Sequence, residues 1–152
     1  MWQELISLER EEPQQQEATV VFLGSAGCGK SSLVQSLLSG GKESGVVPPP
    51  TPALDYKFAR SSVGATAEKR ISHLWELGGG RELAPLVDMP LKRCVGVPLL
   101  CVVGSLLQPC TLLRDVLFWT KHAKQLQKDT LLLVVATHTL DHNQCESELQ
   151  RV

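Results

Sequence analysis

One short string constrains the fold of this chain more than any other feature. Residues 24–31 read Gly-Ser-Ala-Gly-Cys-Gly-Lys-Ser and match the phosphate-binding loop pattern G-x-x-x-x-G-K-[ST] at every required position. Before it, the apolar and β-branched run Ala18–Gly24 is typical of a strand buried on both faces. After it, Ser31–Leu38 carries leucine and valine at helical spacing. The order strand, glycine loop, helix predicts a site for nucleotide phosphates at a helix N-terminus.

Each residue type in this loop has a physical role in holding phosphate. Glycines let backbone N–H groups turn inward, Lys30 adds a positive charge, and Ser31 is expected to bind Mg²⁺. Cys28 is interpreted as a filler of the loop, with a redox-sensitive thiol as the alternative. For the whole string the alternative is a glycine turn that binds nothing. The candidate nucleotide-binding residues are Gly24, Ser25, Ala26, Gly27, Cys28, Gly29, Lys30, Ser31, Ser32 and Asp141.

The rest of the hydrophobic pattern predicts an α/β domain. Strands and helices mixed in this order favour a mostly parallel sheet with helices on both faces. The expected elements are a hairpin of strands at Leu54–Phe58 and Ile71–Leu77 joined by the polar segment Arg60–Arg70, buried strands at Leu99–Val103 and Thr130–Ala136, a loop at Ser39–Pro52 and a helix at Leu112–Leu126.

The length of 152 residues fits one domain with flanking polar segments. We expect a polar arm at 1–17 with a short helix at Trp2–Leu8, the domain at 18–141, and a polar tail at 142–152. Fifteen basic and sixteen acidic residues argue against a nucleic-acid surface held by bulk charge. The longest apolar run, Val95–Leu107, is too short for a membrane span, so no membrane insertion is expected.

A second string resembles the catalytic region of Ras-like GTPases, with two changes. Trp75-Glu76-Leu77-Gly78-Gly79-Gly80 stands where those enzymes carry D-x-x-G followed by glutamine. Glu76 takes the place of the aspartate that holds Mg²⁺ through water, and Gly80 takes the place of the glutamine that orients the attacking water. Thr51 stands where the switch threonine reaches Mg²⁺ and the γ-phosphate. The alternatives are a flexible glycine turn and an ordinary threonine preceding a strand.

The guanine-reading motif N-K-x-D is largely missing. After the last expected strand the chain reads Thr137-His138-Thr139-Leu140-Asp141, and only the aspartate remains. Specificity for guanine is therefore not expected from these residues. GTP or GDP with Mg²⁺ is the first candidate cofactor, and ATP or ADP stays open.

Two segments make the chain resemble the dynein light intermediate chain family, particularly its dynein-2 branch. They are Pro50-Thr51-Pro52-Ala53-Leu54-Asp55-Tyr56 and His73-Leu74-Trp75-Glu76-Leu77-Gly78-Gly79-Gly80. The resemblance extends over about residues 18–109, and Trp2–Arg10 is similar to the family's N-terminal helix. It implies a Ras-like P-loop NTPase fold from which the family's C-terminal strand and helix are missing, as in a shortened form.

The resemblance also implies a function. Family members are non-catalytic accessory subunits of the cytoplasmic dynein-2 motor, and their Ras-like domain docks on the dynein heavy chain. The implied partners are this heavy chain and other dynein-2 subunits, and the implied locations are the cytoplasm, the cytoskeleton, the cilium and the ciliary base. The alternative is an active small Ras-like GTPase that switches partners on hydrolysis. Gly80 favours the accessory subunit, whereas intact Lys30 and Ser31 keep the enzyme open.

Overall fold

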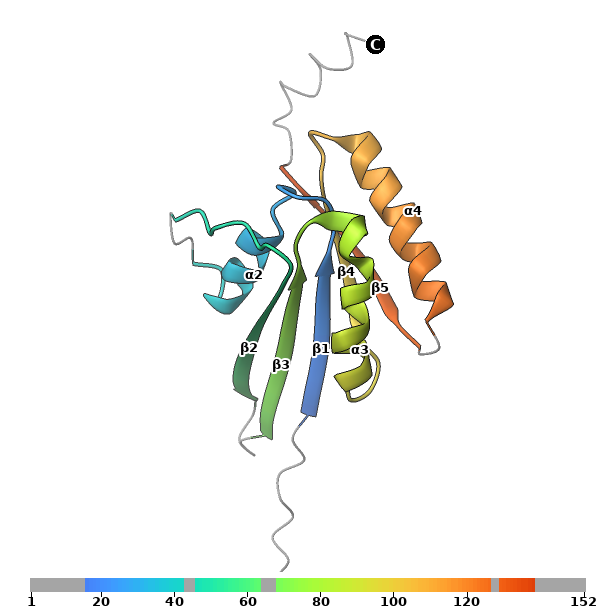
Figure 1. The fold of residues 1–152 in the computed structure, drawn as a ribbon. Helices are drawn as coiled ribbons and strands as arrows, with labels where there is room; N and C mark the ends of the chain where they lie inside the picture. Colours follow the sequence, from blue (N-terminus) through green and yellow to red (C-terminus); the bar gives the residue numbers. More distant parts are fainter. Residues whose placement is uncertain (1–15, 43–45, 64–67, 127–128, 139–152) are drawn as a thin grey trace, which may run out of the picture.

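A five-stranded sheet with helices on both faces forms the body of the protein (Figure 1). The computed structural model describes residues 16–42, 46–63, 68–126 and 129–138. The elements in chain order are β1 Gln16–Leu23, α2 Lys30–Leu38, β2 Leu54–Val63, β3 Glu68–Leu77, the 3₁₀ helix η1 Gly80–Val87, α3 Asp88–Arg93, β4 Leu99–Ser105, α4 Pro109–Gln125 and β5 Leu131–Thr137.

The strand order is β2-β3-β1-β4-β5. Strand β1 pairs in parallel with β3 and β4, β4 pairs in parallel with β5, and β2 alone runs antiparallel to its neighbour β3. The prediction of an α/β fold with a mostly parallel sheet is therefore confirmed. The arrangement is consistent with the Ras-like P-loop fold expected from the sequence. The short helix expected at Trp2–Leu8 lies outside the described residues.

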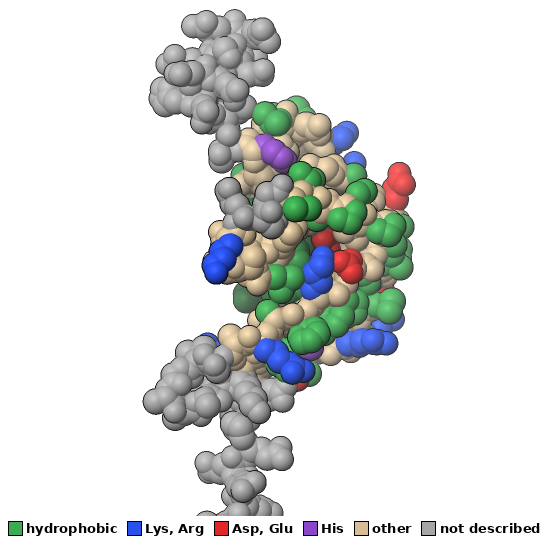
Figure 2. All heavy atoms as spheres, turned by 90° about the vertical axis from the view of Figure 1, so that its left-hand side faces the viewer, with side chains coloured by type: hydrophobic (Ala, Val, Ile, Leu, Met, Phe, Trp, Pro, Cys, Tyr) green, Lys and Arg blue, Asp and Glu red, His purple; other side chains and the backbone are tan. Residues whose placement is uncertain are grey.

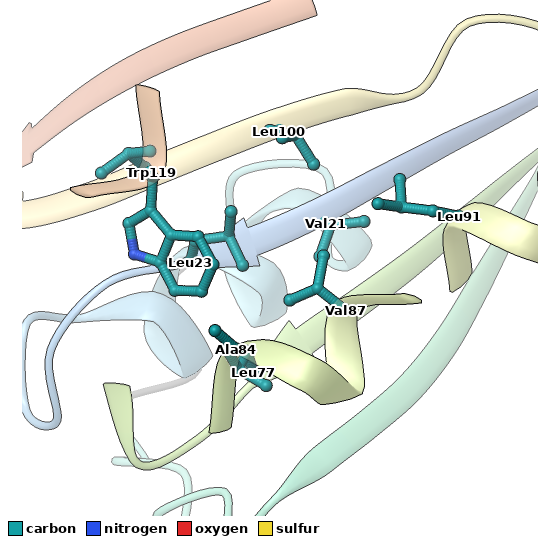
Figure 3. Close-up of a cluster of buried hydrophobic side chains, with 9 residues drawn as sticks. Val21, Leu23, Leu77, Ala84, Val87, Leu91, Leu100 and Trp119 are labelled. Atoms are coloured by element: carbon teal, nitrogen blue, oxygen red, sulfur yellow. The ribbon is translucent and has the colours of Figure 1, made fainter. Parts of the chain in front are cut away.

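The two faces of the sheet carry separate apolar cores, because successive side chains of a strand point to opposite faces. On one face, residues of β1, β3 and β4 pack against η1, α3 and α4. Figure 3 shows Trp119 of α4 beside Leu23 of β1, with Ala84 and Val87 of η1 closing the cluster. On the other face, Phe22 and neighbouring residues pack against Val34 of α2.

The hairpin is longer than the sequence predicted. The polar segment Arg60–Arg70 was expected to connect the strands, but β2 continues to Val63 and β3 begins at Glu68. Antiparallel pairing stays in register down to Val63 opposite Glu68. The polar sequence does not end these strands, because the two backbones keep pairing with each other beyond the part of the sheet that carries the apolar core.

The expectation that the last strand is buried is wrong. Strand β5 forms close to its predicted bounds, but the side chains of Leu131, Leu132, Leu133 and Val134 are 38–61% exposed. β5 is the outermost strand of the sheet, paired with β4 alone. An unbroken apolar run is typical of a strand covered on both faces, and the described part of the chain does not provide that cover.

A row of aromatic side chains lies on the two strands at the opposite edge. Tyr56 stacks near Phe58 and His73, and its ring centroid lies 4.6 Å from that of Trp75. Tyr56 and Phe58 are 43% and 51% exposed, and the Arg60 guanidinium lies 5.2 Å from the Phe58 ring centroid. Figure 2 views the side that carries α2 and β2, where hydrophobic side chains gather over much of the surface.

Candidate functional site

The glycine loop, residues 24–31, connects the end of β1 to the start of α2. Its backbone needs glycine at two positions for different reasons. A Cβ on Gly24 would lie 2.0 Å from the backbone oxygen of Val103, so no side chain fits there. Gly29 has φ +94° and directly precedes the first helical residue, Lys30. These constraints make the loop a tight turn that ends at a helix N-terminus, where backbone N–H groups are free to bind an anion.

The Lys30 side chain is folded into this loop. It is only 5% exposed, and its Nζ donates to the backbone oxygens of Gly24 at 2.9 Å and Ser25 at 2.8 Å. The two carbonyls hold the ammonium at the centre of the turn. A buried positive charge at this place is the arrangement that attracts a phosphate anion.

Ser31 and Glu76 meet beside the loop although they are far apart in the chain. Ser31 Oγ donates to Glu76 Oε1 at 2.5 Å. The Glu76 carboxylate is 2% exposed, and its Oε2 has no hydrogen-bond partner among the described residues. A buried carboxylate oxygen without a donor is costly, and a cation would relieve it. Hydroxyl and carboxylate oxygens are ligands that suit Mg²⁺, so the donor set fits the ion expected from the sequence.

A cavity of about 280 Å³ opens next to these side chains. It brings together residues that the sequence singled out separately, from the loop, from the segment before β2 and from the end of β3. Those predicted residues are Ala26, Gly27, Gly29, Lys30, Ser31, Ser32, Thr51 and Glu76. Asp141, predicted to contact the base, lies outside the described residues. His138, which was not predicted as a site residue, also lines the cavity and has φ 52°.

The three glycines after Leu77 have distinct steric roles. A Cβ on Gly78 would lie 1.9 Å from the Thr51 backbone oxygen, and the Gly78 N–H donates to the Ala53 oxygen at 2.6 Å. Gly79 and Gly80 have φ +66° and +72°. A Cβ on Gly80 would face the Cα of Ser25 at 3.7 Å. These glycines therefore hold the Thr51 segment against the end of β3 and begin η1, which a merely flexible turn would not do.

Arg81 follows these glycines and contacts α4; it is not among the residues that line the cavity. Its Nε lies 3.5 Å from Asp115 Oδ1, and its guanidinium lies 5.8 Å from the ring centroid of Phe118. The sequence alone allows Arg81 either to replace the missing glutamine or to face solvent. Its side chain is 40% exposed and also contacts Asp115 and Phe118 of α4, so it is partly in solvent and partly held on α4.

Sequence reasoning missed two side chains that shape the loop. Thr137, at the end of β5, donates through Oγ1 to the Cys28 oxygen at 2.6 Å. Asp115 of α4 is 1% exposed and accepts from Ser25 through both the backbone N–H and the hydroxyl. The only sequence signal for Thr137 is its place directly after an apolar strand. The sequence signal for Asp115 is that a charged residue stands on the apolar side of the predicted helix.

Cys28 fits its interpretation as a filler of the loop. It is 5% exposed, and its thiol donates to the Val103 oxygen at 3.1 Å. Burial raises the pKa of Cys28, and the Lys30 ammonium opposes that shift. Burial also raises the pKa of Cys101, on the neighbouring strand, to about 11. Both thiols stay protonated near neutral pH, which keeps them unreactive.

The fold and the loop together define the class of protein. It is an α/β domain consistent with the Ras-like P-loop fold, with a loop that carries the complete G-x-x-x-x-G-K-S pattern. No protein-family profile matches the chain.

Individual relatives make the assignment more specific. The chain is 38% identical over 89 residues, 55% of its length, to a Danio rerio protein named cytoplasmic dynein 2 light intermediate chain 1. It is 37% identical to the Homo sapiens protein of that name over 75 residues, 49% of the chain. These matches cover 24% and 20% of the two relatives, so the chain spans about a quarter or less of their length. The resemblance to dynein-2 light intermediate chains is thereby confirmed for the matched half of the chain.

Proposed function

We propose that this chain acts as a non-catalytic accessory subunit of the cytoplasmic dynein-2 motor. In this role its domain docks on the dynein-2 heavy chain and supports retrograde intraflagellar transport and cilium assembly. The observation that carries the proposal is the similarity to dynein-2 light intermediate chains over half of the chain. The proposed locations are the cytoplasm, the cytoskeleton, the cilium and the ciliary base. Among the described helices, none has the length and apolar character needed to cross a membrane.

In this proposal the glycine loop holds a nucleotide as a structural ligand and does not turn it over. It binds GTP or GDP, or an adenine nucleotide, together with Mg²⁺. Lys30 and the backbone N–H groups of the loop contact the phosphates, while Ser31 and Glu76 hold the ion with Thr51 nearby. When bound, the ion neutralises phosphate charge. Support comes from the short Ser31–Glu76 contact and the unpartnered Glu76 Oε2 beside the cavity.

Slow hydrolysis follows from the residues after β3. Ras-like catalysis needs a side chain that orients water in line with the γ-phosphate. Gly80 has no side chain, and Arg81 is held by Asp115 on α4. Neither residue is in a position to orient that water, so a bound nucleotide would persist.

The competing function is an active small GTPase, which the intact Lys30 and Ser31 favour. Two measurements separate it from the accessory subunit. Single-turnover hydrolysis with saturating Mg²⁺ is expected to be far below about 1 per second, a common speed for enzymes, and a rate at or above that speed would establish the GTPase. Tagged chain is expected to co-purify with the dynein-2 heavy chain from ciliated cells, using a full-length relative as positive control. Repeated absence of the heavy chain would remove the subunit role.

A further inference from the structure

The second residue of the glycine loop is held from two sides. Its carbonyl oxygen accepts from Lys30 Nζ at 2.8 Å. Its N–H donates to Asp115 Oδ2 at 2.9 Å, and its hydroxyl donates to the same oxygen at 2.6 Å. Ser25 thus uses its hydroxyl and both backbone polar groups to fix the first turn of the loop. One of the three anchors comes from α2, and the other two come from α4, 90 residues away.

Among the described residues, the polar groups that contact the Asp115 carboxylate are donors and a cation, and its Oδ1 accepts no hydrogen bond. Besides the two groups of Ser25, the Nε of Arg81 lies 3.5 Å from its other oxygen, Oδ1. A carboxylate is an acceptor without a proton of its own, so it matches this environment, whereas an amide would turn an NH₂ group toward a donor. The carboxylate is 1% exposed, and such a charge is retained when a cation and hydrogen bonds offset its desolvation.

Arg81 brings a second part of the site into this contact. It lies in η1, directly after the glycines that follow Glu76. Glu76 in turn accepts from Ser31 at the far end of the glycine loop. The loop is therefore connected to the β3–η1 segment at both of its ends, through Glu76 at one end and through Asp115 and Arg81 at the other.

We propose that Asp115 is a positioning residue of the glycine loop. Through Ser25 it keeps the loop in the shape that receives a phosphate, and through Arg81 it links that shape to the position of η1. A displacement of η1 removes the cation from Asp115 and loosens the loop, so a protein that binds η1 or α4 would change the lifetime of a bound nucleotide. The role in loop shape stands by itself, whereas the effect on nucleotide rests on the proposed function.

Two buried cysteines allow the loop to be tested without a nucleotide. Cys28 belongs to the loop, while Cys101 lies on β4 and reports unfolding of the whole sheet. We would measure the alkylation of each thiol by iodoacetamide with mass spectrometry. Asp115→Asn preserves side-chain volume but removes the charge that strengthens the two Ser25 bonds, and it turns an NH₂ group toward Arg81. It is expected to raise the labelling of Cys28 relative to Cys101 about tenfold. Asp88→Asn, at an exposed acid of α3, is the matched control and should leave the ratio unchanged.

Two further variants separate the contributions within the link. Arg81→Gln is expected to raise the ratio about threefold, because Asp115 keeps both bonds to Ser25 but loses its cation. Ser25→Ala removes only the hydroxyl bond and should also have a smaller effect than Asp115→Asn. Arg81 is 40% exposed, so its variant should fold even if Asp115→Asn does not. The proposal would be overturned if the Arg81 and Asp115 variants both alkylate Cys28 and Cys101 faster by the same factor. It would also be overturned if neither variant changes the alkylation of either cysteine.

A second arm measures the dissociation of fluorescent GDP and fluorescent ADP. Asp115→Asn is expected to speed release of the bound probe about tenfold and Arg81→Gln about threefold, with Asp88→Asn unchanged. Unchanged release in the first two variants would overturn the link to nucleotide. If the unmodified protein binds neither probe, the nucleotide part of the proposed function fails, and the Cys28 to Cys101 ratio alone decides whether Asp115 positions the loop.

Discussion

The glycine loop and strand β5 differ in how well the described chain surrounds their side chains: the polar groups of the loop have partners, whereas the apolar groups of β5 are not covered. In the loop, Lys30 is buried with two carbonyl acceptors, and Ser31 has a carboxylate partner. In β5, four consecutive apolar side chains at 131–134 are 38–61% exposed. Exposed apolar surface costs about 25 cal/mol per Å² relative to buried surface. The polar groups of the loop are thus already paired and oriented, whereas β5 carries apolar surface that the described residues leave uncovered.

This difference suggests that the molecule separates two tasks. A site whose polar groups are already oriented binds a small ligand without rearrangement. An outer strand with apolar side chains toward both faces is suited to association with another protein segment. Four predictions test this separation.

Removing the loop cation should have the largest effect. Lys30→Met keeps the aliphatic stem but removes the ammonium, so we expect nucleotide affinity to fall at least about 100-fold, measured by calorimetry with GDP and ADP. Lys42→Met, at an exposed lysine, is the matched control. Affinity within threefold of the unmodified protein would show that the loop does not bind phosphate.

Filling the space at Gly78 should destabilise the whole fold. In Gly78→Ala the new Cβ would lie 1.9 Å from the backbone oxygen of Thr51, and backbone gives way less easily than a side chain. We expect a loss of about 3 kcal/mol in urea unfolding. Gly41→Ala is the control, because Gly41 has φ +82° but no atom within 4 Å of the added Cβ. Gly78 is not among the glycines with positive φ, so a loss at Gly78 no larger than the loss at Gly41 would contradict the close contact as the cause.

Charging β5 should weaken association and leave the loop intact. Leu131→Glu combined with Leu133→Glu is expected to reduce co-purification with the dynein-2 heavy chain more than about tenfold, because carboxylates resist burial. Nucleotide affinity should stay within twofold. The matched control is Leu37→Glu on α2, where the leucine is 56% exposed. Unchanged co-purification in the double variant would place the heavy-chain contact elsewhere.

The smallest effect is expected where the two regions touch. Thr137 ends β5 and donates to the Cys28 oxygen in the loop. Thr137→Val preserves the shape and removes this bond, so we expect a loss of about 1 kcal/mol in urea unfolding and weaker nucleotide binding. Thr120→Val on α4, at a half-buried threonine, is the control. If the two losses are the same, the bond from β5 does not support the loop.

Local patterns in the sequence were sufficient for much of the fold. The strand before the glycine loop, the helix after it and the strand at 99–103 were predicted close to their observed bounds. The helix η1 and the short α3 were not predicted. η1 begins at a glycine with positive φ, and each of the two helices contains a proline, so they lack the regular apolar spacing of a longer helix.

The sequence by itself determined the glycine loop, because that turn needs glycine and lysine at set positions within eight residues. Only the tertiary structure decided which distant side chains complete it. Glu76 bonds to a residue 45 positions away, Asp115 to one 90 away and Thr137 to one 109 away. The exposure of β5 was likewise decided by strand order. The physical reason is that periodicity reports the conformation of a segment, whereas contacts and burial depend on which segments pack beside it.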